Sequence, residues 1–386
     1  MRYHKTILGQ MLQLFSRLEF QSFVKKYKGD HRVRTLRCWD QFIYLLFTQL
    51  GKQHSLRDTI DTMNTQQRKL YHFGAQKLSR STLSDANHKR DYRIYEDLFF
   101  LLLKRVQKIA PKYKLKLNRK LFVLDSTTID LCLKLFPWAR FRKAKGAIRL
   151  HTLMQVDGSL PVFVRITDGK VHDQTVAKNL ELPKGSFVVF DRGYTDYAQY
   201  NAYNDNKIRF ITRMKKNAQT NQVKSNPAVK DSNVLSDEKV VFTGYYTSRK
   251  YHDPIRKIIY KDTENNKELV FLTNAFDLDA QTIANIYKAR WEIELFFKTI
   301  KQNLKIKRFI GNSPNAVWTQ VWIALIAYLL ISYQKFILKT KYSIQKIFKI
   351  IQVNLFERKS LEDLLTDNLV KPPEFVNKWQ FCLFES

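Results

Sequence analysis

The chain has 386 residues, which is enough for two or three domains, and its apolar content of 44% argues against a disordered protein. Lysine and arginine total 67 against 35 aspartate and glutamate, a formal net charge of +32 that is spread along the whole length. A chain with this charge repels itself unless a polyanion neutralises it. Nucleic acid is therefore the favoured partner, and an anionic membrane surface is the competing one.

The N-terminus, the cysteines and the apolar runs predict a cytoplasmic protein with no membrane span. The N-terminus has no apolar segment followed by a small-residue cleavage site, so we expect no signal peptide. The three cysteines, Cys38, Cys132 and Cys382, are far apart, which argues against disulfides and a structural zinc. The longest apolar run, 321–331, has 11 residues where a span needs roughly 20, so we interpret it as a buried helix.

Residues 1–110 are predicted to form an all-helical DNA-binding or accessory domain, because apolar clusters alternate with basic polar segments. Within this domain, segments 56–63 and 78–90, with Gly74 in the connection, are compatible with a helix-turn-helix. Helix pairs are also abundant in proteins that do not bind DNA, so an ordinary pair is the alternative.

If the second helix of this pair binds DNA, Ser81 or Thr82 would cap its start. Its basic side chains would then face phosphates or base edges of the DNA. These side chains are Arg80, His88, Lys89 and Arg90.

Residues 111–216 change to the pattern of a mixed α/β protein. Short apolar runs bounded by polar residues predict buried strands, and Asp157-Gly158 is a favoured hairpin turn. The predicted elements are a strand at 120–125, a hairpin at 147–169, a helix at 172–180, a strand at 187–191, a helix at 195–206 and a strand at 208–215. Strand, hairpin, helix, strand, helix is the order of a ribonuclease H-like core, of which 111–216 would be the first part.

A β-rich insertion is predicted at 217–276. Its first part, 217–239, is polar and rich in Asn, Lys and Ser, which favours an exposed loop. Strand-like runs follow at 240–249, 254–262 and 267–275. The last part of the core is predicted at 277–340, with helices at 287–301 and 317–338, before a C-terminal helical tail at 341–386.

Segment 287–301, YKARWEIELFFKTIK, contains no Pro or Gly and repeats its apolar residues at helical spacing, which predicts a helix. Successive residues of a helix are about 100° apart around its axis, which places the apolar and the polar residues of this segment on two separate stripes. The apolar stripe is Ala289, Ile293, Phe296 and Ile300, and the polar stripe is Tyr287, Arg290, Glu294, Lys298 and Lys301. The simplest interpretation is a solvated face on which Arg290 and Glu294 form an i,i+4 ion pair.

Two apolar runs upstream of this helix each end in an aspartate, Asp125 and Asp191. Either aspartate could cap a turn, because turn-forming residues follow both of them. If they converge with Glu294, the three carboxylates offer the oxygen ligands that Mg²⁺ or Mn²⁺ prefers. Such a site can hold two ions roughly 3.5 to 4 Å apart and cleave phosphodiesters in line. Arg290, Lys298 and Lys301 would then hold the phosphates of the scissile strand.

The spacing of Tyr287, Arg290, Glu294 and Lys301 resembles the signature of the insertion sequence four family of DDE transposases. DSTTIDL after the first aspartate, FDRGY at the second, FLTN before the helix and YKARWEIELFFKTIKQ through it are also similar to that family. The resemblance runs from about residue 10 to 335. It implies a ribonuclease H-like catalytic domain with a β-strand insertion, preceded by an all-helical N-terminal domain.

The resemblance also implies a function and a site. The protein would be a cut-and-paste DNA transposase that cleaves terminal inverted repeats and transfers the 3′-hydroxyl into target DNA, as a homodimer on paired ends. Asp125, Asp191 and Glu294 would be the catalytic triad that binds Mg²⁺ or Mn²⁺, with two ions expected. Tyr287, Arg290 and Lys301 would contact the transposon-end phosphates.

Further residues have two interpretations each. In relatives of this kind an aromatic residue can stabilise a flipped base, a role that Trp291 could take, although an indole near an apolar stripe is more often packing. Lys145 and His151 would touch DNA or lie on a solvated hairpin. His172 and Asp173, in the segment GKVHDQT, would support the metal site or start a helix.

Two other functions remain open. One is a ribonuclease H-like nuclease that hydrolyses DNA without joining it, and the other is a DNA-binding protein that has lost catalysis. In each case we expect a bacterial cytoplasmic protein associated with the nucleoid.

Overall fold

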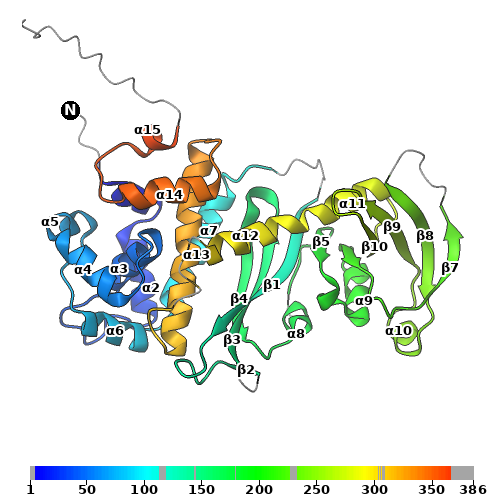
Figure 1. Ribbon diagram of the computed structural model, residues 1–386, viewed down its shortest axis with the longest axis horizontal. Coiled ribbons are helices and arrows are strands. Elements are labelled where there is room, and N and C mark those ends of the chain that lie inside the picture. The colour runs from blue at the N-terminus through cyan, green and yellow to red at the C-terminus, as the bar shows by residue number, and fades with distance from the viewer. Residues whose placement is uncertain are drawn as a thin grey trace, which may run out of the picture.

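The structure is a computed structural model that describes residues 5–112, 119–142, 145–178, 180–226, 233–302, 304, 306 and 309–366. Helices build the N-terminal part, as predicted, and lie on one side of the molecule (Figure 1). They are α1 (Ile7–Met11), α2 (Arg17–Lys26), α3 (Cys38–Leu50), α4 (Leu56–Thr65), α5 (Gln67–Leu70), α6 (Arg80–Lys89) and α7 (Arg93–Gln107). Helix α3 is the centre of this region, because all 13 of its residues are buried.

The predicted helix pair consists of α4 and α6, but a helix-turn-helix has a turn of only 3–4 residues. Here α5 and a 3₁₀ turn at Tyr71–Phe73 lie between the two helices. Ser79 caps α6, because its hydroxyl accepts a hydrogen bond from the N–H of Thr82. The caps predicted at Ser81 and Thr82 are therefore wrong.

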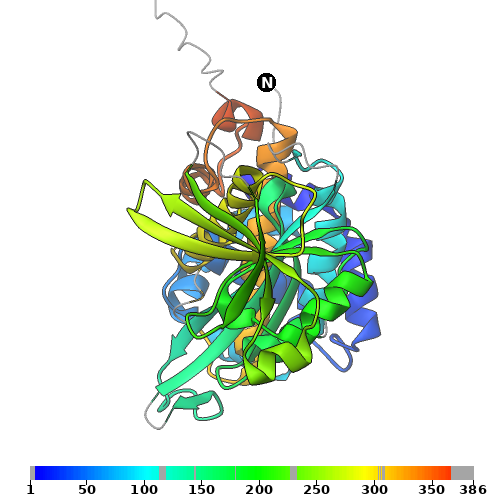
Figure 2. The same ribbon diagram turned by 90° about the vertical axis from the view of Figure 1, so that its right-hand side faces the viewer.

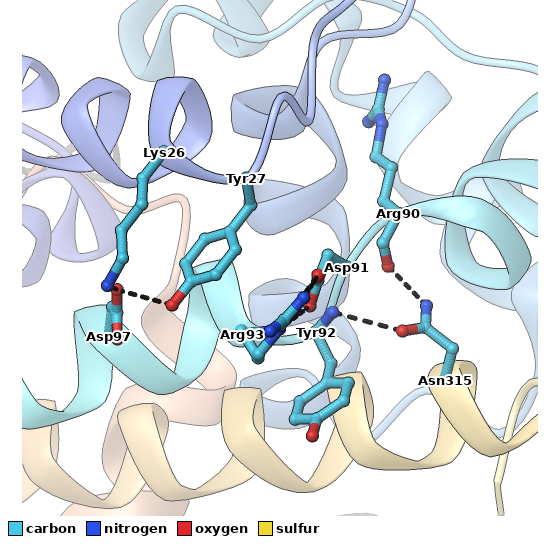
Figure 3. Close-up of polar contacts among 8 residues, drawn as sticks. All are labelled: Lys26, Tyr27, Arg90, Asp91, Tyr92, Arg93, Asp97 and Asn315. Carbon is cyan, nitrogen blue, oxygen red and sulfur yellow. Dashed lines mark hydrogen bonds and ion pairs between the residues drawn. The ribbon is translucent and has the colours of Figure 1, made fainter.

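The connection from α6 to α7 is fixed to the long helix α13 (Pro314–Ile337) by Asn315 (Figure 3). The Asn315 side chain accepts from the N–H of Tyr92 at 3.2 Å and donates to the carbonyl oxygen of Arg90. The Arg90 side chain is only 8% exposed, and its guanidinium donates to the Gln41 amide oxygen at 3.1 Å and to the Leu36 carbonyl oxygen. This buried position contradicts the DNA contact predicted for Arg90.

Within the described residues, ten strands form one sheet in the order β2-β3-β1-β5-β6-β10-β9-β8-β7, with β4 paired to β3. The strands are β1 (Leu121–Leu131), β2 (Arg140–Arg142), β3 (Lys145–Gln155), β4 (Leu160–Asp168), β5 (Phe187–Phe190), β6 (Arg209–Arg213), β7 (Thr220–Ser225), β8 (Val234–Phe242), β9 (Ile255–Asp262) and β10 (Lys267–Thr273). β4, β3 and β1 are antiparallel neighbours, and β5 and β6 run parallel to β1. This is the ribonuclease H-like arrangement, so the predicted fold class is confirmed.

The hairpin from β3 to β4 turns at Asp157-Gly158, as predicted. Gly158 has a φ of 68°, a conformation that glycine adopts without the penalty of a Cβ. Strand β1, in contrast, is longer than predicted: it continues past Asp125 to Leu131, because residues 122–131 all pair with β3. Asp125 therefore lies within a strand rather than at its exit.

Two predictions for the segment 217–249 are wrong. The polar stretch 217–239 contains β7 and most of β8 rather than a continuous loop, because β7 is an exposed edge strand that needs few apolar residues. The strand predicted at 240–249 ends at Phe242, and Tyr245–Lys250 forms the short helix α10. β10 pairs with β6, so the strands of 217–276 extend the core sheet. The division of the chain into domains stays a prediction.

Helices cover the two faces of the twisted sheet, whose strands fan out in Figure 2. Val123 and Val189 pack in one core with α13 and with α11 (Ala280–Lys288) and α12 (Arg290–Gln302). Leu124 and Phe190 pack in a second core with α9 (Tyr197–Asp205). Helices α8 (Asp173–Ala177) and α10 lie on that second side (Figure 1). Successive residues of β1 thus face different helices.

Helix α13 contains the long apolar run and separates the helical region from the sheet (Figure 1). By length and composition it could cross a membrane, yet 89% of its most apolar window is buried inside the protein. This burial confirms the interpretation as a core helix. The chain continues with α14 (Ile344–Asn354) and α15 (Leu361–Leu365). Cys38 and Cys132 are free, and Cys382 lies outside the described residues.

Candidate active site

Asp125 and Asp191 lie next to each other on neighbouring parallel strands. Leu124 of β1 pairs with Phe190 of β5, and each aspartate is the next residue along the chain. Because paired strands are about 4.8 Å apart, this register brings both aspartates to one level of the sheet. Side-chain alternation places Asp125 on the face of Val123, which α12 covers.

Helix α12 adds Glu294 and connects it to Asp125 through Arg290. One guanidinium nitrogen of Arg290, Nη2, lies 2.6 Å from Oε1 of Glu294, and the other, Nη1, lies 3.4 Å from Oδ2 of Asp125. The side chains of Asp125, Arg290 and Glu294 are 19%, 22% and 35% exposed. Arg290 is therefore a partly desolvated cation that bridges two of the three predicted acids.

Burial raises the pKa of Asp125 to about 6, from an ordinary value of 3.8. The Ser126 N–H and the Arg290 guanidinium lower this pKa, whereas the negative charges of Asp191 and Glu294 raise it. Asp191 and Glu294 are thus close enough to Asp125 for their charges to act on it. Arg213 follows Thr212, the β6 partner of Phe190, so three carboxylates face two arginines and this face keeps an excess of negative charge.

The chemistry of these side chains fits Mg²⁺ or Mn²⁺, because carboxylate oxygens are the ligands that these ions prefer. Within the part of the chain that the structure describes, no three His, Cys, Asp or Glu side chains are close enough together to hold a metal ion. Arg290 lies between Asp125 and Glu294 and forms an ion pair with each of them.

The signature segment spans two helices instead of the single helix predicted over 287–301. Tyr287 is in the last turn of α11, and α12 begins at Arg290 after a turn at Ala289. At this junction the Ala289 N–H bonds to the Ile286 carbonyl and the Glu292 N–H to the Ala289 carbonyl, both at 3.0 Å. These bonds span three residues instead of the four of an α-helix, which tightens the turn.

Tyr287 lies beside this acidic site. Its side chain is 7% exposed, and the Arg290 guanidinium carbon lies 5.9 Å from the centre of its ring. Burial raises the pKa of Tyr287 to about 12, and the charge of Arg290 lowers it. The hydroxyl therefore stays protonated at neutral pH as a hydrogen-bond donor.

The other predicted DNA-contacting residues are placed differently. The apolar stripe of α12 is buried as predicted, Lys298 is exposed and Lys301 is half-buried. The Trp291 side chain is 62% exposed, which rules out the alternative that it packs in the core. Lys145 at the start of β3 and Arg80 at the start of α6 are both exposed, in regions away from α12.

A second polar cluster lies behind β1, on the opposite face from α12. Asp173 of α8 accepts a hydrogen bond from the Ser126 hydroxyl at 2.8 Å, pairs with Arg149 at 3.2 Å and lies 3.3 Å from Nδ1 of His151. His151 is fully buried, and its Nε2 bonds the Thr167 hydroxyl at 2.9 Å.

These contacts decide two open interpretations. His151 cannot touch DNA from its buried position, and Asp173 binds strands β1 and β3 instead of capping a helix. The cluster itself is not predictable from single residues, because Ser126, Arg149 and Asp173 come from three separate segments. The only signal in the sequence is the polar pair His172-Asp173 directly before a short helix.

Comparisons with known proteins agree with this architecture. Residues 116–330 match the transposase DDE domain family, and residues 3–76 match a domain of unknown function. A protein of Sinorhizobium fredii that is named a transposase is 30% identical over 282 residues, which cover 72% of this chain and 78% of that protein. A transposase for the insertion sequence element IS5377 of Geobacillus stearothermophilus is 28% identical over 335 residues, 86% of this chain and 85% of the relative.

Among solved structures, the piggyBac transposase synaptic complex with hairpin DNA aligns with a TM-score of 0.47 and 11% identity. The alignment covers 94% of this chain and 82% of that chain. This similarity is too weak to bear on function.

Proposed function

Because the chain belongs to the transposase DDE domain family, in its insertion sequence four type, and is thus a DNA transposase, we propose that Asp125, Asp191 and Glu294 are its catalytic residues. Members of this family use divalent metal ions. The observation that carries the proposal is the register that brings Asp125 and Asp191 to one level of neighbouring strands, with Glu294 of α12 joined to Asp125 through Arg290.

In this proposal, the three carboxylates hold Mg²⁺ or Mn²⁺, with two ions expected. Ions held by these carboxylates would supply activation of a water or 3′-hydroxyl nucleophile and stabilisation of the leaving oxygen. Asp125 must be ionised to serve as a ligand. The Arg290 guanidinium must leave Asp125 to make room, and the phosphate of a bound DNA strand is the acceptor that its planar fork fits.

Residues around the acidic site would hold the DNA in place. Tyr287 donates its hydroxyl, and Lys298 and Lys301 extend the cationic side of α12 beyond Arg290. The exposed Trp291 is available to stack on an unpaired base, since base stacking on an aromatic ring contributes about 1–3 kcal/mol. Arg80 and Lys145 would contact DNA further from the site.

The wider proposal is cut-and-paste transposition in the bacterial cytoplasm, at the nucleoid. A homodimer would bring the two terminal repeats together, cleave at their boundaries and transfer both 3′-hydroxyl ends into target DNA. The competing functions, a nuclease without joining and an inactive DNA-binding protein, differ from this proposal in the products they form.

The test is incubation of a labelled duplex carrying the element's own terminal repeat with supercoiled plasmid, in Mg²⁺ and in EDTA. The proposal expects metal-dependent cleavage at the repeat boundary and labelled plasmid from strand transfer. Cleaved ends without joined product would support the nuclease. Tight binding with no cleavage in Mg²⁺ or Mn²⁺ would contradict catalysis by this chain.

A further inference from the structure

A second basic site lies at the edge of the sheet where the parallel strands begin. Three loops meet there: Arg119 and Lys120 precede β1, Lys184 and Ser186 precede β5, and Lys207 precedes β6, whose first residue is Arg209. These six residues line one open cavity of about 760 Å³, which we call the amino-edge cavity. Among the described residues on its wall, five are cations and none is acidic.

The positive charge of this cavity is largely unneutralised. Arg209 pairs with Asp277 at 3.4 Å and donates to the Asn274 carbonyl oxygen at 3.0 Å. Within the described residues, Lys120, Lys184 and Lys207 make no ion pair, and all three are exposed. Lys207 follows the C-terminus of α9, and the partial negative charge of a helix C-terminus stabilises a nearby cation. Lys120 and Lys184 have no such helix end to stabilise.

A buried hydroxyl gives a second and independent indication of a ligand. Ser186 is one of the lining residues, its side chain is only 2% exposed, and its hydroxyl has no hydrogen-bond partner within the described residues. The Nε–H of Arg209 is likewise buried without an acceptor. Unpaired buried donors cost about 1–3 kcal/mol each, so an acceptor that reached these two atoms through the wall of the cavity would remove this penalty.

The chemistry of the wall favours phosphate groups over bases or metabolites. No lining residue in the described part of the chain is aromatic, so these residues offer the ring of a nucleotide base no aromatic platform. The lysines stand at the exposed rim instead of enclosing a small molecule, and they can follow several successive charges of a polyanion. Contacts of this kind read the backbone of DNA and not its sequence.

The position of the cavity separates it from the catalytic site. Asp125 is the fifth residue of β1, so the first residue of that strand, Leu121, is about 13 Å from the acidic level of the sheet. The cavity opens before Leu121, at the far end of the same strands. A duplex bound at the acidic site reaches the cavity only by extending along the strands or by bending around the sheet, and otherwise a second segment fills the cavity.

We propose that the amino-edge cavity binds the phosphodiester backbone of a DNA duplex. The inference assumes a protein that acts on DNA, but it does not depend on the residues proposed for catalysis. The duplex has two possible sources: the protein's own terminal repeat, bent around the sheet, or the target DNA.

The test compares wild type with the triple variant Lys120→Glu, Lys184→Glu, Lys207→Glu. The matched control carries the same charge change at three exposed lysines elsewhere, Lys104→Glu, Lys341→Glu and Lys349→Glu. Circular dichroism and thermal unfolding verify that both variants fold. One arm measures affinity for a labelled terminal-repeat duplex over a series of salt concentrations. The other measures capture of an unrelated duplex by the complex preassembled on the terminal repeat.

Each lost phosphate contact reduces the steepness of the plot of log affinity against log salt by about 0.9. The triple variant at the amino-edge cavity should therefore have a slope that is shallower by roughly 2–3. The control triple should lose less than about 1. Loss in the first arm identifies the terminal repeat as the source, and loss in the second arm alone identifies target DNA. If the amino-edge triple behaves like the control in both arms, the proposal is wrong.

A third variant tests the site without changing its charge. Ser186→Ala removes the unpaired hydroxyl. It should weaken DNA binding by roughly 3- to 10-fold in the arm in which the amino-edge triple variant loses binding. Failure of wild type to cleave its repeat would contradict the catalytic proposal and leave these binding measurements valid. The two proposals can therefore fail separately.

Discussion

Asp125 and Ser126 are neighbours on β1, yet they belong to two polar clusters that differ in their balance of carboxylates and cations. On the α12 face, Asp125 meets two further carboxylates and one arginine, and its pKa is raised to about 6. On the other face, Ser126 donates to Asp173, which has Arg149 and His151 as partners. The pKa of Asp173 is lowered, because hydrogen bonds from His151 and Ser126 and the charge of Arg149 outweigh its burial.

The difference separates a binding site from a structural cluster. A carboxylate with an arginine, a histidine and a hydroxyl has its charge and its hydrogen bonds satisfied within the protein, so it needs no ligand. Three carboxylates with two arginines, Arg290 and Arg213, keep a net negative charge, which a bound cation would neutralise. We therefore expect loss of Asp125 or Glu294 to affect catalysis, and loss of Asp173 to affect stability.

The largest expected effect is the loss of cleavage in Glu294→Gln. Removing a metal ligand should lower the rate of cleavage at the repeat boundary by roughly 10³-fold or more, because metal catalysis contributes several kcal/mol. The matched control is Glu292→Gln on the same helix. The Glu292 carboxylate accepts a hydrogen bond of 2.8 Å from the Ser159 hydroxyl and is not part of the acidic site. Equal cleavage rates in the two variants would contradict the assignment of Glu294 to the metal site.

The next effect concerns stability. Asp173→Ala leaves Arg149 and buried His151 without their carboxylate, so the free energy of unfolding should fall by about 2–4 kcal/mol. Urea unfolding measures the loss. Asp130→Ala, at an exposed carboxylate of the same strand β1, should change stability by less than about 0.5 kcal/mol. A similar small change in Asp173→Ala would mean that the cluster is not structural.

The two clusters should also respond to pH in opposite directions. The folded protein holds a proton on Asp125 more tightly than the unfolded chain, so this group's contribution to the unfolding free energy falls as pH rises from about 4 to 6. Asp173 has a lowered pKa, so its contribution is complete above about pH 4 and is lost as pH falls further.

This pH dependence is measured by urea unfolding from pH 3 to 7 in EDTA. Asp125→Asn should remove the fall between pH 4 and 6, and Asp173→Asn should reduce the loss at lower pH. If neither variant changes the pH profile of wild type, the charge balance assigned to both clusters is wrong.

The smallest effect on stability is expected at Trp291, which belongs to neither core. Because its side chain is 62% exposed, Trp291→Ala should change the unfolding free energy by less than about 0.5 kcal/mol. Loss of a stacked base should weaken binding of a repeat end with unpaired bases by roughly 1–3 kcal/mol. A fully paired duplex is the control, and equal weakening of both substrates would contradict base stacking.

The sequence predicts the strands and the helix that carry the three proposed catalytic carboxylates better than it predicts their surroundings. Asp125, Asp191 and Glu294 are visible because apolar strands and a patterned helix carry each of them. The break at Ala289 is not visible, because Ala is a strong helix former and the turn depends on tertiary packing. The β7 edge strand escapes notice because exposed strands have little apolar pattern. The Asp173 cluster and the buried Arg90 depend on long-range contacts that no local pattern encodes.

The most direct test of the comparison is Mn²⁺ binding, measured by electron paramagnetic resonance on wild type, Asp125→Asn and Asp130→Asn with the terminal-repeat duplex present. Our account predicts that Asp125→Asn weakens Mn²⁺ binding at least about 10-fold, the usual cost of a lost contact in a metal site. Asp130→Asn should bind as wild type does. Equal Mn²⁺ affinity in all three proteins would contradict the assignment of the acidic face of β1 as the metal site.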